Sequence, residues 1–102
     1  MIPMVRHQAP SLALLREHRE EILRLADKRR VSNIRIFGSV ARGDATPESD
    51  IDLLVDFDPA DSGLDLVAFE MDLEALLGYH VEAGTGVHEV IRNRVESQAV
   101  DL

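Results

Sequence analysis

The chain has 102 residues, a formal net charge of −8 and no cysteine, which predicts one domain and excludes disulfides and thiolate metal sites. So acidic a chain gains little from the phosphate backbone of nucleic acids, and we expect no direct nucleic-acid binding. No apolar run approaches the ~20 residues of a membrane span, and residues 1–10 lack a signal-peptide apolar stretch. We therefore expect no membrane contact and a cytoplasmic location.

The first third of the chain predicts a tail, a helix and a strand. Prolines disfavour helix near the start, so we expect residues 1–10 to form a flexible tail ahead of a single domain over residues 11–102. Ser11 is a suitable N-cap, and apolar residues recur at helical spacing over residues 12–28. The apolar run that follows predicts a strand over residues 33–37.

The rest of the chain alternates strands and helices. From Asp50 onward, apolar residues alternate with aspartates, a pattern typical of a half-buried strand, and it predicts a strand over residues 51–57. A loop then leads to a helix that Asp61 or Ser62 caps and Gly78 ends, with an apolar face broad enough for a core or a partner surface. The elements expected after it are a strand over residues 79–83, a helix over 87–95 and a short tail over 99–102. This order predicts an α/β or α+β fold.

Two carboxylates lie on one face of the strand that follows the turn-rich segment. Side chains at i and i+2 point the same way, so Asp50 and Asp52 share a face. Their ionised forms repel each other unless a cation lies between them. Mg²⁺ prefers oxygen ligands and is commonly held by one or two carboxylates together with substrate phosphates. The pair therefore indicates a magnesium site.

A phosphate site is indicated upstream, where the first strand ends in Gly38 and Ser39. Glycine lets the backbone come close to a phosphate, and a helical turn beginning there would offer free N–H groups to an anion. Ser39 is a candidate to contact the phosphates, with capping of the turn as the simpler alternative. Arg42 is a candidate for phosphate or partner contact, with an ion pair to Asp44 or Glu48 as its alternative.

The segment resembles a known signature. The chain reads Gly-Ser-Val-Ala-Arg-Gly over residues 38–43 and Ser-Asp-Ile-Asp-Leu-Leu-Val over residues 49–55. Gly-Ser followed at this spacing by Asp-x-Asp resembles the signature of the nucleotidyltransferase (polymerase-beta-like) superfamily. The fuller form is similar to the minimal nucleotidyltransferases, small bacterial and archaeal proteins that are often antitoxins paired with HEPN-domain RNase toxins. The resemblance implies a small mixed sheet of about three to four strands flanked by helices, with the active cleft at one sheet edge.

The resemblance also implies a third acid on a later strand, usually an aspartate. The matching position here is Glu82, whose side chain is one methylene longer. We expect Glu82 either to help hold a second ion and activate the acceptor, or to be a surface acid of a weakened enzyme, because a misplacement of ~1 Å can cost about 10²-fold in rate. Alternation places His80 on the same face, either behind the ligands or as an exposed or structural residue.

The resemblance implies a Mg²⁺-dependent transfer of AMP from ATP to a hydroxyl group, with two ions at the site. The catalytic and metal-binding residues that it implies are Asp50, Asp52 and Glu82, and the nucleotide-binding residues are Gly38, Ser39 and Arg42. The implied acceptor is a hydroxyl, often of tyrosine, on a HEPN-domain toxin that the chain would silence as an antitoxin. Two alternatives remain: a weakened module that neutralises its partner by stoichiometric contact, and a transferase acting on a small molecule or an RNA end.

Overall fold

The computed structural model of the chain describes residues 8–58, 63–85 and 99–102, and it contains a four-stranded sheet in the order β3-β2-β1-β4. The strands are β1 (Val31–Phe37), β2 (Ile51–Phe57), β3 (Val81–Gly84) and β4 (Val100–Asp101). β2 runs antiparallel to β1 and parallel to β3, while β4 is antiparallel to β1. This mixed sheet with its helices confirms the predicted α/β class, and β2 has the bounds expected from its alternating pattern.

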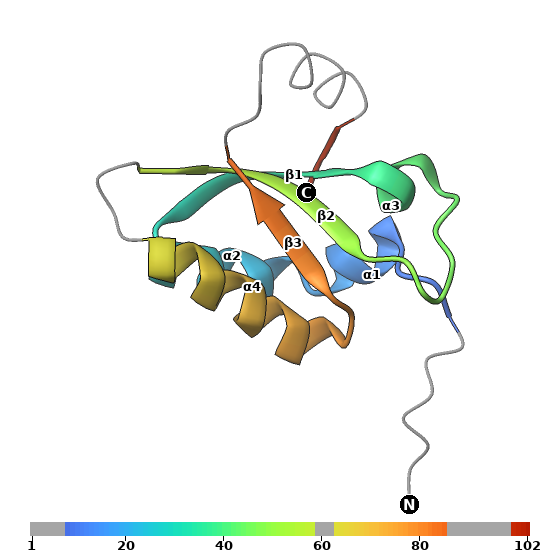
Figure 1. Ribbon diagram of the computed structural model, residues 1–102, viewed down its shortest axis with the longest axis horizontal. Coiled ribbons are helices and arrows are strands. Elements are labelled where there is room, and N and C mark those ends of the chain that lie inside the picture. The colour runs from blue at the N-terminus through green and yellow to red at the C-terminus, as the bar shows by residue number, and fades with distance from the viewer. Residues whose placement is uncertain (1–7, 59–62, 86–98) are drawn as a thin grey trace, which may run out of the picture.

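Three helices cover one face of the sheet (Figure 1), and they are α1 (Leu12–Glu17), α2 (Arg19–Lys28) and α4 (Gly63–Leu77). A short fourth helix, α3 (Gly38–Arg42), follows β1 directly. Two parallel strands cannot be joined by a tight turn, and α4 provides the crossover from β2 to β3. Burial of large side chains from both layers stabilises this arrangement; they include Leu15, Ile22, Ile36, Ile51, Phe69 and Leu73.

The first helix is interrupted, whereas the sequence predicts one continuous helix over residues 12–28. Ser11 caps α1 as predicted, since its hydroxyl accepts from the Leu14 N–H at 3.1 Å. The helix ends because the His18 N–H donates three residues back, to the Leu15 carbonyl at 3.1 Å, a tightened bond typical of a helix end. His18 then precedes α2 with non-helical φ −103° and ψ 18°.

The helix α4 buries only part of the broad apolar face that its sequence predicts. Phe69, Leu73 and Leu77 face the core, whereas Leu64, Val67 and Met71 are 76%, 50% and 62% exposed. Periodicity could not separate the two stripes because apolar residues occur on both. Gly78, with φ 82°, follows the helix as expected, while the predicted caps Asp61 and Ser62 lie outside the described residues.

The predicted tail over residues 99–102 is wrong in part, because this segment contains the edge strand β4. Val100 pairs with Ile36, and Asp101 pairs with Arg35. The short strand covers part of the β1 edge, whose backbone groups would otherwise lack partners on that side. The helix predicted over residues 87–95 lies outside the described residues. None of the helices described is both long enough and apolar enough to cross a membrane.

A bulge in β1 determines which of its side chains face the core. The register between β1 and β2 slips by one residue near Asn33, which has φ 53°, a left-handed conformation that asparagine tolerates better than most residues. The extra residue changes the phase of the alternation, so that Val31 is buried on the same side as Ile34 and Ile36. β1 then ends with Phe37 opposite Asp52, which brings the following helix α3 close to β2.

Candidate active site

Four polar side chains share one face of the sheet where β2 and β3 begin. Asp50 precedes β2 and Asp52 lies within it, while His80 precedes β3 and Glu82 lies within it. The parallel register pairs Asp52 with Glu82, and the Ile51 N–H donates to the His80 carbonyl at 2.9 Å, which sets Asp50 beside His80. Because side chains at i and i+2 share a face, the two strands together present a two-by-two array of acids and imidazole.

The loop ahead of Asp50 is held by its own hydroxyl groups. The Thr46 N–H donates to Ser49 Oγ at 2.8 Å, and the Ser49 N–H donates to the Thr46 carbonyl at 2.9 Å. Such side-chain-to-backbone bonds are typical of turns that serine and threonine stabilise. The turn fixes the direction in which the chain enters β2, and with it the position of Asp50.

The loop that leaves β1 meets the acidic strand at Gly38. A Cβ atom at this position would lie 2.6 Å from Asp52 Oδ2, closer than real Cβ contacts allow, and φ of Gly38 is +74°. Glycine is therefore required here both for the backbone conformation and for the close approach of the carboxylate. The predicted phosphate loop and the predicted metal-binding strand lie next to each other.

The other two predicted nucleotide-binding residues belong to α3. The helix begins at Gly38, so that Ser39 lies in its first turn and Arg42 in its last. Arg42 Nε donates to Asp44 Oδ2 at 3.3 Å, and the Arg42 side chain is 48% exposed. The ion pair to Asp44 was one of the alternatives for Arg42, and its exposed guanidinium leaves a further contact open.

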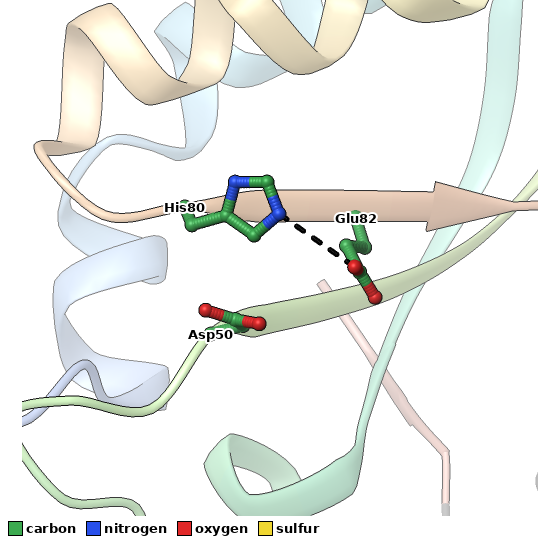
Figure 2. Close-up of side chains that lie close together, drawn as sticks. All are labelled: Asp50, His80 and Glu82. Carbon is green, nitrogen blue, oxygen red and sulfur yellow. Dashed lines mark ion pairs between the residues drawn. The ribbon is translucent and has the colours of Figure 1, made fainter.

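Three members of the array come close enough to share one ion. One ligand atom each from Asp50, His80 and Glu82 lies within 4.8 Å of the others, and all three residues are exposed (Figure 2). Asp52 is not a member of this group, since its carboxylate lies toward Gly38 instead. Sequence reasoning placed His80 behind the ligands or left it as an exposed or structural residue. The signal that could have found it is the repeated spacing, Asp-x-Asp on one strand and His-x-Glu on its parallel neighbour.

The charges of the array act on one another. Desolvation by partial burial, followed by the negative charges of Glu82 and Asp50, raises the pKa of the Asp52 carboxyl above its ordinary value. Desolvation would lower the pKa of His80, but the nearby carboxylates of Asp50, Glu74 and Glu82 outweigh it and raise that pKa. In both groups the nearby carboxylates raise the pKa, so this face is electronegative enough to favour a bound positive charge.

Two glutamates of α4 hold the free edge of β3, a feature that the sequence analysis did not anticipate. The Val81 N–H donates to Glu74 Oε2 at 3.0 Å, and the Ala83 N–H donates to Glu70 Oε2 at 2.7 Å. Residues four apart share one helix face, so this spacing matches the alternate N–H groups of an edge strand. Glu74 Oε2 also lies 2.7 Å from His80 Nδ1, so α4 fixes both the strand and the imidazole.

A cleft of about 590 Å³ runs along the same edge, within the range of small-molecule sites. Its lining includes Phe37, Asp52, His80 and Glu82 from the sheet side, and Met71 and Glu74 from α4. Three members of the array, Asp52, His80 and Glu82, therefore open onto a space large enough for a nucleotide.

Known proteins are similar to this chain over most of its length. The profile described as "Nucleotidyltransferase domain" matches residues 15–100. A Methanocaldococcus jannaschii protein provisionally named a protein adenylyltransferase is 37% identical over 90 residues, which cover 86% of this chain and 97% of that protein. The similarity thus includes the array, the glycine loop and the helices that support them.

Solved structures show the same fold. A structure provisionally named a minimal nucleotidyltransferase superposes with a TM-score of 0.80 at 38% identity, covering 91% of this chain and 97% of that one. A complex of a tri-AMPylated Shewanella oneidensis HEPN toxin with an MNT antitoxin matches with a TM-score of 0.62 at 18% identity, over 84% of this chain and 69% of that one. At that identity, the second likeness shows the shared fold alone.

Replacement of Gly38 by alanine tests the approach of the glycine loop to Asp52. Gly43→Ala is the matched control, because φ of Gly43 is +83° but no atom lies within 4 Å of its Cβ position. Both variants should lose about 1–2 kcal/mol of unfolding free energy, the cost of a left-handed alanine. Only Gly38→Ala should also displace the Asp52 carboxylate. Mg²⁺ with ATP should then raise the melting temperature of wild type and Gly43→Ala, but not of Gly38→Ala; an equal rise in all three would contradict the contact.

Replacement of Asp52 by asparagine should stabilise the metal-free protein at pH 7. Because the pKa of Asp52 is raised in the folded chain, its contribution to stability is complete below the ordinary carboxyl pKa and is lost as the pH rises through the raised value. Thermal melts should give Asp52→Asn a higher melting temperature than wild type at pH 7. The difference should shrink toward pH 3.8, the ordinary pKa of an aspartate carboxyl.

The control for that substitution is Asp56→Asn, on the same strand. Asp56 forms an ion pair with Arg35, with 3.2 Å between Asp56 Oδ1 and Arg35 Nη2, so removal of its charge should not stabilise the chain. An Asp52→Asn variant no more stable than wild type at pH 7 would show that the carboxylates of the array do not strain one another.

Proposed function

The chain belongs to the nucleotidyltransferase domain family, and on this basis we propose that it transfers AMP from ATP to a hydroxyl group of a partner protein. The observation that carries the proposal is the meeting of Gly38 with Asp52 beside Asp50 and Glu82. Because Gly38 has no side chain, the backbone there can approach a triphosphate, while the acids beside it can hold the cation that accompanies the triphosphate. The name of the M. jannaschii relative, 37% identical, supports the reaction class.

The donor set of the array fits Mg²⁺, which the family implies. Asp50, Asp52 and Glu82 offer carboxylate oxygens on one face of the sheet, and burial followed by their mutual repulsion raises the pKa of Asp52. Hard cations with oxygen ligands relieve such repulsion. Asp50 and Asp52 would bind the first Mg²⁺ ion. Glu82 would help these acids to bind a second ion. When bound, Mg²⁺ neutralises charge on the α-phosphate and on the departing pyrophosphate.

The residues of the chain bind the nucleotide, orient it and accept a proton. Gly38 and Ser39 contact the β- and γ-phosphates from the loop after β1, and Arg42 adds a positive charge nearby. The acceptor oxygen forms a bond to the α-phosphorus of ATP, the bond from that phosphorus to the bridging oxygen breaks, and pyrophosphate leaves. Glu82 accepts the hydroxyl proton. Most of the rate acceleration comes from positioning and from charge stabilisation, as in other phosphoryl transfers.

The acceptor that we propose is a tyrosine hydroxyl of a cognate HEPN-domain toxin, which makes the chain the antitoxin of the pair. Support comes from the S. oneidensis complex, in which an MNT antitoxin of the same fold accompanies a tri-AMPylated HEPN toxin. The cleft beside β3 is open at the sheet edge, so a side chain presented by another protein can reach the array.

A second candidate function is neutralisation by stoichiometric contact with a weakened site. It is favoured by Glu82, which stands where the family usually has the shorter aspartate and is exposed at the array. A carboxylate displaced by one methylene would activate the acceptor poorly. The two candidates differ in one measurable property, because only the enzyme changes the mass of its partner.

The test is mass spectrometry of the toxin after incubation with this chain, ATP and Mg²⁺. The toxin should gain one or more AMP groups, and Asp50→Asn and Asp52→Asn should each slow that gain by at least about 100-fold. The reason is that metal-ion stabilisation is worth several kcal/mol, with 1.36 kcal/mol for each tenfold. EDTA should have the same effect. Asp56→Asn, which lies on the same strand outside the array, should remain active.

Toxin activity measured in the same samples separates the candidates. Neutralisation that tracks the gain of AMP supports the enzyme. Full neutralisation of an unmodified toxin, also by the Asp50→Asn/Asp52→Asn double variant, would overturn the enzymatic proposal in favour of stoichiometric contact. A toxin that is neither modified nor silenced would contradict both.

A further inference from the structure

His80 is exposed, but both of its ring nitrogens face carboxylates, as those of a metal-binding histidine do. Its Nδ1 lies 2.7 Å from Glu74 Oε2, and because an ionised carboxylate only accepts, Nδ1 donates. Its Nε2 lies 3.6 Å from Glu82 Oε2, which is too far for a hydrogen bond. When Nε2 gives up its proton to a metal ion, the other proton stays on Nδ1 and the imidazole presents the lone pair of Nε2 to the array.

This arrangement matches the way in which proteins prepare a histidine for a metal ion. A ligating histidine almost always donates its second ring N–H to a carboxylate or carbonyl, which fixes the tautomer and the orientation of the ring. Here that carboxylate is Glu74, itself anchored by the Val81 N–H at 3.0 Å. The helix α4 thus holds the imidazole through Nδ1, and the Nε2 atom faces Asp50 and Glu82.

The geometry of the array leaves a place for a nitrogen ligand. Asp50, His80 and Glu82 form the close group, with ligand atoms within 4.8 Å of one another, whereas the Asp52 carboxylate lies against Gly38. Small rotations of three exposed side chains would bring their ligand atoms onto one ion. That ion would have two carboxylate oxygens and one imidazole nitrogen from the chain.

We propose that His80, through Nε2, is a ligand of the divalent ion held by Asp50 and Glu82, and that this nitrogen makes the site favour a first-row transition ion such as Mn²⁺ over Mg²⁺. Mg²⁺ prefers oxygen ligands, whereas imidazole suits transition ions. The inference rests on the proposed function, because the ion is the one that would serve nucleotide transfer. Asp52 and the phosphates remain free to hold a second ion with oxygen ligands alone.

The experiment is Mn²⁺ titration of the full chain, followed by electron paramagnetic resonance. The free-ion signal gives the Kd, and electron spin echo modulation detects a ¹⁴N nucleus bonded to Mn²⁺. We expect nitrogen modulation in wild type and none in His80→Gln. The Mn²⁺ Kd should rise by at least about 10-fold in the variant, since even loss of a group behind a ligand costs that much, while the Mg²⁺ Kd changes little.

His18→Gln is the matched control. His18 Nδ1 lies 2.9 Å from Glu21 Oε1, much as His80 Nδ1 lies beside Glu74, but His18 belongs to no metal-binding group within residues 8–58, 63–85 and 99–102. It should keep the nitrogen modulation and the Mn²⁺ Kd of wild type. Because the His80 side chain is 57% exposed, His80→Gln should fold, and its melting temperature without metal checks this.

Failure of this proposal differs from failure of the proposed function. Wild type that binds Mn²⁺ without nitrogen modulation, or that does not bind Mn²⁺, would overturn His80 as a ligand, whether or not the toxin gains AMP with Mg²⁺. Unchanged modulation in His80→Gln would overturn it as well. Nitrogen modulation lost only in His80→Gln would support the ligand even if no AMP transfer were detected, and in that case the reaction would have to be sought elsewhere.

Discussion

Repulsion between like charges on one face of a sheet is the constraint on which this structure depends. Asp50, Asp52 and Glu82 are brought together by the parallel register of β2 and β3, and burial with mutual repulsion raises the pKa of Asp52. Such a face costs stability in the folded chain, and proteins retain costs of this kind mainly at functional sites. A divalent cation removes the cost and draws in a triphosphate, which connects the strain of the fold to the proposed chemistry.

The surrounding elements hold the charges in place and offset only part of their repulsion. The glutamates of α4 bind the free N–H groups of β3, so the edge strand that carries Glu82 has partners on both sides. Gly38 lets the loop after β1 reach the Asp52 carboxylate, and the bulge at Asn33 sets the phase with which β1 arrives there. The glutamates of α4 are remote in sequence from Asn33 and Gly38, yet all of these residues act on the position of one carboxylate face.

Much of this architecture could be predicted from local pattern. The alternation of acids and apolar residues gave the bounds of β2, and the glycine after β1 marked the turn into α3. The predictions that failed concerned features that depend on tertiary contacts or on single hydrogen bonds. A two-residue strand such as β4 has no period to detect, and the break at His18 depends on one hydrogen bond. The role of His80 depends on the register between two strands, which the sequence of neither strand contains. The assignments of the individual site residues stay predictions, since the geometry brings them together but no ligand identifies their roles.

The central claim is that the acidic face and the glycine loop bind one magnesium–triphosphate together. Isothermal titration calorimetry of the wild-type chain with ATP tests it most directly, with Mg²⁺ in one series and EDTA in the other. The account predicts saturable binding of one ATP per chain in Mg²⁺ and its loss in EDTA, because the uncompensated carboxylates repel the phosphates. ATP binding of equal affinity in both series, or no binding in either, would contradict it.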